Sequence, residues 1–144
     1  MSLSLDSTTD VQKLRLELRL KQLERVESCQ NNFLPFVNSM WPQFIAGRHH
    51  YLIAEKLEEI ANGTLKRLII NMPPRHTKSE FASFLFPAWM IGRNPAMKII
   101  QATHTTELAV NFGRKVKNLL EQDDYQEIFD NTVLSVDSKA SGRW

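Results

Sequence analysis

The sequence has little of what marks several whole classes of protein. Its single cysteine, Cys29, excludes an intramolecular disulfide and fits a reducing compartment. No apolar run approaches the roughly 20 residues of a membrane-spanning helix, and the N-terminus lacks the basic and apolar regions of a signal peptide. The net charge of +2 does not by itself indicate a nucleic-acid partner. The 144 residues therefore predict a soluble, cytoplasmic chain with one domain.

Much of the chain carries a helical pattern. Residues 10–29 are rich in Leu, Lys, Arg and Glu, which favours a helix over the strand that the alternating portion LRLELRL also permits. Because Val11, Leu14 and Leu18 share one face, we expect this helix to pack on another element. Further helices are predicted at residues 49–61, 79–91 with a kink at Pro87, 106–121 and 126–129. Residues 31–47, interrupted by Pro35 and Pro42, are predicted to form an irregular connector.

Short apolar segments alternate with these helices from residue 66 onward. Residues 66–71, 98–102 and 132–136 have the length and composition of buried strands. Strands that alternate with helices predict an α/β fold with a parallel sheet flanked by helices, here preceded by an N-terminal helical segment. Ligands of such sheets bind beyond the C-terminal ends of the strands, and the first such end is NMPPRHTKSE, residues 71–80.

This stretch has the spacing of a phosphate-binding loop but no glycine. Lys78 and Ser79 supply the ending of the pattern G-x-x-x-x-G-K-[ST], whereas Met72 and Thr77 stand where its glycines belong. The glycines let the backbone curl so that successive N–H groups point at phosphate oxygens. A β-branched residue in the left-handed conformation costs about 1–2 kcal/mol. Thr77 must therefore either avoid that conformation or be held in a strained one.

A plain capping turn is the competing interpretation. The Thr77 hydroxyl would accept a hydrogen bond from the Glu80 amide, and the Glu80 side chain would reach back to Thr77. This capping box leaves Arg75, His76 and Lys78 unexplained, because they place positive charge at the positive end of a helix. A bound anion would offset that charge, so the cations favour a phosphate site.

A family resemblance comes from the residues around this loop. Residues 65–95, LKRLIINMPPRHTKSEFASFLFPAWMIGRNP, resemble the ATPase core of the large terminase subunit of tailed bacteriophages. That family reads PPRHGKSE in the loop and continues with a P-A-W-x-x-G-x-x-P segment. The stretches RHHYLIAEKLEEIANG, THTTELAVNFGRKVKNLL and DSKASGRW extend the resemblance over roughly residues 33–144. Thr77 replaces the usual glycine, which bears on loop geometry and hydrolysis rate.

The resemblance implies an ASCE-type P-loop ATPase that uses ATP and Mg²⁺ to drive double-stranded DNA into a procapsid. It divides the chain into an N-terminal helical segment, 1–32, and an incomplete ATPase domain, 33–144. Lys78 would contact the β- and γ-phosphates, Ser79 would hold Mg²⁺, and Arg75 would be the catalytic residue that stabilises transition-state charge. The implied partners are a portal protein, a small terminase subunit and further copies in a ring, in the host cytoplasm. The implied nucleotide-binding residues are His50, Pro74, Arg75, His76, Thr77, Lys78, Ser79 and Glu80.

Several residues keep two interpretations. His50 either contacts the adenine or is an ordinary surface histidine. Thr103 and His104 either sense nucleotide or DNA or form a helix-capping turn. A basic face on the helix at 106–121 either meets DNA or is a solvated surface, the commoner case. That face consists of Arg114, Lys115 and Lys117.

An acidic motif that such an ATPase needs is missing after Lys78. Asp123 and Asp124 lie in a predicted turn, and we interpret Asp137 as structural. We therefore expect the chain to stop before that motif, to be inactive alone, and to be marginally stable or to self-associate through unpaired strand edges. The alternatives are another P-loop nucleic-acid translocase, such as a superfamily 2 helicase, or a non-catalytic interaction fragment in which Thr77 caps a helix.

Overall fold

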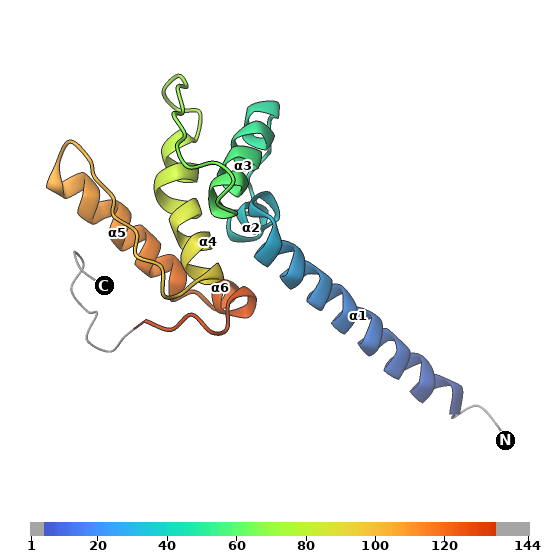
Figure 1. The fold of residues 1–144 in the computed structure, drawn as a ribbon. Helices are drawn as coiled ribbons and strands as arrows, with labels where there is room; N and C mark the ends of the chain where they lie inside the picture. The colour runs from blue at the N-terminus through green and yellow to red at the C-terminus, as the bar shows by residue number, and fades with distance from the viewer. Residues whose placement is uncertain (1–4, 135–144) are drawn as a thin grey trace.

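A computed structural model describes residues 5–134, and every regular element within that range is a helix (Figure 1). No strand forms in this part of the chain, so the predicted α/β fold with a parallel sheet is wrong. The π-helix η1 continues directly into α4. The elements are α1 (Leu5–Asn31), α2 (Phe33–Met40), α3 (Arg48–Ala61), η1 (Glu80–Leu85), α4 (Phe86–Arg93), α5 (Thr106–Leu120) and α6 (Asp123–Ile128).

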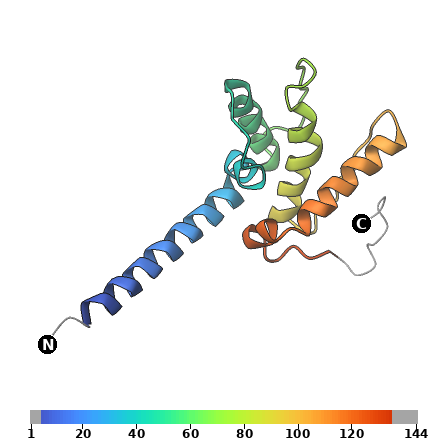
Figure 2. The same ribbon diagram turned by 180° about the vertical axis from the view of Figure 1, so that it is seen from behind.

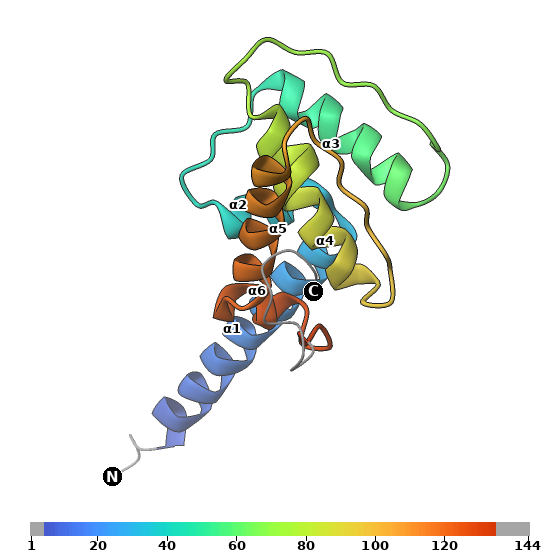
Figure 3. The ribbon, with the colours of Figure 1, turned by 90° about the vertical axis from the view of Figure 1, so that its left-hand side faces the viewer.

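The segments predicted to be strands are irregular connections. Residues 66–71 and 98–102 lie in long links that run past α3 and α4 (Figure 3), and Ile69 and Ile100 are 85% and 95% exposed. Residues 132–134 are also irregular, and residues 135–136 lie outside the described range. A strand needs a neighbour to pair with its N–H and C=O groups, and no described part of these segments pairs with another. The strand edges on which the predicted self-association depended are therefore absent from residues 5–134.

The predicted helices are largely confirmed, unlike the predicted strands. Four of the five predicted segments form helices close to the expected bounds, and α6 begins at Asp123, earlier than expected. Gly63, two residues after the end of α3, has a left-handed φ of 76°, the conformation in which a glycine commonly follows a helix. The predicted irregular connector at 31–47 is wrong in part, because it contains α2. Pro35 is accommodated in the first turn of α2, where its missing N–H has no intrahelical partner to lose.

Pro87 does not end the helix that contains it. It has no N–H to donate to the Ser83 carbonyl one turn earlier, and the π-helical turn η1 precedes it. The freed carbonyl instead accepts a hydrogen bond from Gln101 Nε2 at 3.3 Å. This bond fastens the link after α4 to η1.

An aromatic core holds the helices together. Phe33 and Phe36 of α2 and Phe81 of η1 are fully buried, as are Trp89 and Tyr125. The Trp89 indole donates from Nε1 to the backbone carbonyl of Cys29 at 2.8 Å, and the Tyr125 hydroxyl donates to the carbonyl of Ala88 at 2.8 Å. These two bonds tie α4 to the end of α1 and to α6, where the surrounding low dielectric makes an unpaired polar group costly.

The N-terminal half of α1 projects away from the other helices, as Figures 1 and 2 show from opposite sides. Val11, Leu14 and Leu18 are all at least half exposed, so the predicted packing of this face on another element is wrong within residues 5–134. None of the helices described here combines the length and apolar composition that a membrane crossing requires.

Candidate functional site

The loop before η1 has an unusual backbone. Arg75 and Thr77 have φ values of 65° and 58°, the left-handed region in which non-glycine residues are uncommon. Helical structure begins at Lys78, directly after Thr77. Thr77 occupies the position where a phosphate-binding loop has its second glycine. The chain therefore adopts the backbone conformation that glycine would permit, and it does so with a β-branched side chain.

Hydrogen bonds hold Thr77 in this conformation. Its hydroxyl donates to the carbonyl of His76 at 2.7 Å, and its own carbonyl accepts from the amide of Phe81 at 3.0 Å. The hydroxyl does not accept from the Glu80 amide, and the Glu80 carboxylate instead pairs with Lys115 at 3.0 Å. The capping box predicted as the competing interpretation is therefore wrong.

His50 connects this loop to α3. The Gly47 amide donates to His50 Nδ1 at 2.9 Å, so we assign the proton of the neutral ring to Nε2. Nε2 lies 2.6 Å from the Thr77 hydroxyl oxygen, to which it donates. The interpretation of His50 as a surface histidine is wrong, because its side chain is only 6% exposed. Its contact with an adenine stays a prediction.

The electrostatic surroundings of His50 favour this neutral form. Burial lowers the pKa of His50 most, and the neighbouring His49 and His76 lower it further. A protonated ring would carry a hydrogen on Nδ1, so Nδ1 could no longer accept the hydrogen bond from the Gly47 amide. The chain of hydrogen bonds from Gly47 through His50 and Thr77 to His76 thus exists only while His50 is uncharged.

Positive charge collects at the loop without acidic partners. Arg75 and His76 are exposed, Lys78 is half-buried, and neither Arg75 nor Lys78 pairs with any carboxylate within residues 5–134. Ser79, in the first helical turn, is exposed, and His76 Nδ1 lies 2.9 Å from the Pro74 carbonyl. The structure therefore brings the predicted residues Pro74–Glu80 and His50 to one place. Their arrangement can receive an anion, because the helix start adds further positive potential.

The other predicted contacts are not part of this arrangement. The Thr103 hydroxyl donates to the carbonyl of Thr105 at 2.6 Å, and Thr105 caps α5 by accepting from the Leu108 amide. This geometry is the helix-capping turn, and a contact of Thr103 or His104 with nucleotide or DNA stays a prediction. Thr105 itself was missed, although a threonine before a helical pattern is the ordinary signal of a cap.

Two of the basic residues predicted to form one face of α5 lie on different parts of its surface. Lys115 turns toward η1, where it pairs with Glu80 and lies within 5.6 Å of the Phe84 ring centre. Arg114 is left on a different part of the helix surface, beside His104. Asp123 and Asp124 lie in the first turn of α6, where negative charge is favourable, and Asp137 lies outside the described range.

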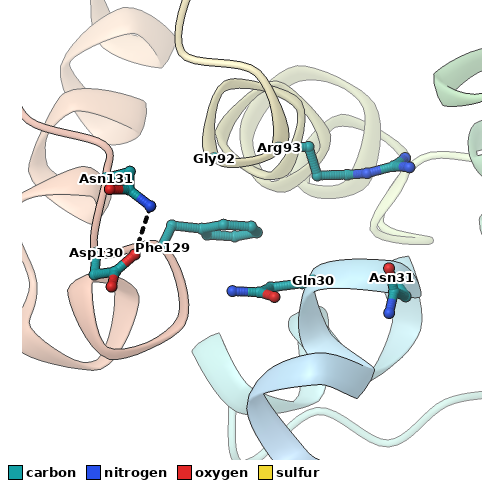
Figure 4. Close-up of a pocket in the computed structure, with 7 residues that line it drawn as sticks. All are labelled: Gln30, Asn31, Gly92, Arg93, Phe129, Asp130 and Asn131. Carbon is teal, nitrogen blue, oxygen red and sulfur yellow. Dashed lines mark hydrogen bonds between the residues drawn. The ribbon is translucent and has the colours of Figure 1, made fainter.

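A separate hollow lies at the far end of α4, between the end of α1 and the segment after α6 (Figure 4). Its polar lining includes Gln30 and Arg93, and none of the predicted site residues reaches it. The Phe129 ring lies against Gly92, where an added Cβ would come within 2.4 Å of the ring. Gly92 lies in the last turn of α4, where this close approach leaves no room for a larger residue.

Comparisons with protein-family models, with curated proteins and with solved structures found no match. Within residues 5–134 no cluster of three or more His, Cys, Asp or Glu side chains is arranged to hold a metal ion.

Proposed function

We propose that the loop Pro74–Glu80 binds the phosphates of a nucleotide, ATP with Mg²⁺. The observation that carries the proposal is the left-handed backbone of Thr77 at the position of the second loop glycine. Holding a non-glycine residue there costs of order 1–3 kcal/mol, and such strain persists where the surrounding structure enforces it, commonly at ligand sites. Left-handed residues in a loop can also turn successive N–H groups to one side, which makes an anion-binding concavity.

The charges of the loop support the same ligand. Arg75 and Lys78 lie with His76 at the positive end of a helix, and the two charged side chains repel one another unless an anion lies between them. Lys78 would reach the β- and γ-phosphates, and Arg75 would stabilise charge on the transferred phosphoryl group. Because no acidic cluster is available in the described residues, Mg²⁺ would be held by the Ser79 hydroxyl and the phosphate oxygens themselves.

His50 would prepare the loop for its ligand. Its neutral ring donates to Thr77 and so holds the strained residue in place before any anion arrives. A loop that is already ordered loses less conformational entropy on binding, which increases affinity. In this proposal His50 supports the loop from α3. From the same position its ring could also contact the adenine of the bound nucleotide.

The wider role that we propose is the ATP-binding part of a DNA-packaging motor like the terminase large subunit. Its support is the resemblance of residues 65–95, in which Arg75, Lys78 and Ser79 match the family pattern in order. The double-stranded DNA, portal and small-subunit partners, the ring and the host cytoplasm belong to this wider proposal. Phosphate binding by the loop rests on its own backbone and charges and does not require this wider role.

Calorimetric titration of the whole chain tests the loop. We expect ATP and inorganic triphosphate to bind with Mg²⁺, and adenosine to bind far more weakly. Lys78→Ala should weaken ATP binding roughly 10–100-fold, because a hydrogen bond to a charged group contributes about 1.5–3 kcal/mol. Lys98→Ala is the matched control, since Lys98 is an exposed lysine remote from the loop in sequence.

Equal weakening by Lys98→Ala would show that only general positive charge is being measured. Absence of ATP and triphosphate binding would refute the phosphate site and leave the interaction-fragment alternative. Binding of ATP without effect on double-stranded DNA or on a portal protein would keep the loop proposal and contradict the wider one.

A further inference from the structure

The projecting half of α1 carries a leucine stripe that nothing in the described chain covers. Leu16, Leu20 and Leu23 are 71%, 57% and 52% exposed. Their spacing of four and three residues places them on one side of the helix, as in the d, a and d positions of a heptad. We call these three residues the outer seam.

The outer seam faces away from the body of the protein. Cys29 of the same helix is buried in the core, and it follows Leu20 by nine positions, which is about two and a half helical turns. The two side chains therefore point in opposite directions. The helices α2, α4 and α6 contact α1, and Cys29 belongs to the core that they share. The N-terminal half of α1, which carries most of the outer seam, stands clear of these helices (Figure 1).

The charges beside the outer seam differ on its two flanks. One flank, the e positions of the heptad, carries Asp10, Glu17 and Glu24. The other flank, the g positions, carries Arg19 preceded by Gln12. In a parallel coiled coil a g residue meets the e residue five positions later on the other helix, so Arg19 of each copy would meet Glu24 of the other. In an antiparallel pair the acidic flanks would meet each other, and so would the arginines.

We propose that the outer seam is a dimerisation surface whose occupant is the α1 helix of a second copy of this chain, parallel and in register. Three leucine layers and two Arg19–Glu24 pairs form the contact, and the two bodies lie on opposite sides of the paired helices. Lys13 and Glu27 occupy the next a positions and limit the seam to these layers. Polar residues at a positions favour one register at a cost in stability, so the dimer is weak and reversible.

Analytical ultracentrifugation of the whole chain over a wide range of concentration tests this surface. We expect a monomer–dimer equilibrium that Leu20→Glu abolishes and that Leu18→Glu leaves unchanged. The control is closely matched, because Leu18 lies on the opposite side of the same helix and is 58% exposed. Circular dichroism of both variants should show unchanged helix content, since neither side chain belongs to the core.

Charge variants test the parallel orientation. Arg19→Glu should shift the equilibrium to monomer, and Arg19→Glu combined with Glu24→Arg should restore the dimer, because each new glutamate then meets an arginine. Lys13→Leu should strengthen association, since it adds a fourth apolar layer. A monomer at every concentration, equal effects of Leu18→Glu and Leu20→Glu, or failure of the charge exchange to restore the dimer would each overturn the proposal.

Discussion

Strain at Thr77 can be measured by comparing two substitutions at one position. Thr77→Ala and Thr77→Gly both remove the hydroxyl that accepts the hydrogen bond from His50, so that loss cancels when the two variants are compared. The remaining difference comes from the backbone conformation. At a φ of 58° the left-handed conformation costs alanine about 1–2 kcal/mol, whereas glycine adopts it without this cost. Against this, glycine lowers the free energy of unfolding by about 0.4–1 kcal/mol relative to alanine, because it increases the conformational entropy of the unfolded chain. We therefore expect Thr77→Gly to be more stable than Thr77→Ala by about 0.5–1 kcal/mol.

Ser79 supplies the matched control two residues further on. It has right-handed helical backbone, with φ −72° and ψ −33°, and it is exposed. Here glycine should be less stable than alanine by roughly 0.5–1 kcal/mol, the ordinary cost of glycine in a helix. Urea unfolding of all four variants, followed by circular dichroism, gives the two differences. The reasoning is refuted if the difference at Thr77 has the same sign as that at Ser79.

Two further perturbations probe the neighbourhood of the loop and the far end of α4. Gly92→Ala should reduce the free energy of unfolding by about 1–3 kcal/mol, because the added Cβ would lie 2.4 Å from the Phe129 ring. Urea unfolding measures this change, and a stability equal to wild type would contradict the close approach. The pKa of His50 is lowered in the folded chain from 6.5, so the unfolded chain binds this proton more tightly and stability should decline as the pH falls below about 6.5. In thermal melts at decreasing pH, the melting temperature of His50→Gln should fall less than that of the wild type. An equal fall in both proteins would assign the effect to other histidines.

The site illustrates which features could be read from the residues. The cluster of Arg75, His76 and Lys78 before a helix is a local pattern, and the structure does place these residues together at a helix start. The conformation of Thr77 could only be posed as two alternatives, because propensity disfavours the one that occurs. The link to His50 was not foreseen as a hydrogen bond, since these residues lie 27 positions apart and no local signal joins them.

By itself, the sequence determined most of the helices and the loop charges, because the apolar spacing and the end signals of a helix act over a few neighbouring residues. The apolar centres at Ile69 and Ile100 equally predicted strands, and they failed for a physical reason. A strand exists only through pairing with a distant segment, so its formation is decided by the tertiary arrangement and not by its own composition. The same arrangement decided that Gly92 meets Phe129 and that His50 holds Thr77. It also left the leucines of α1 uncovered, because the N-terminal half of that helix extends beyond the helices that form the core (Figure 1).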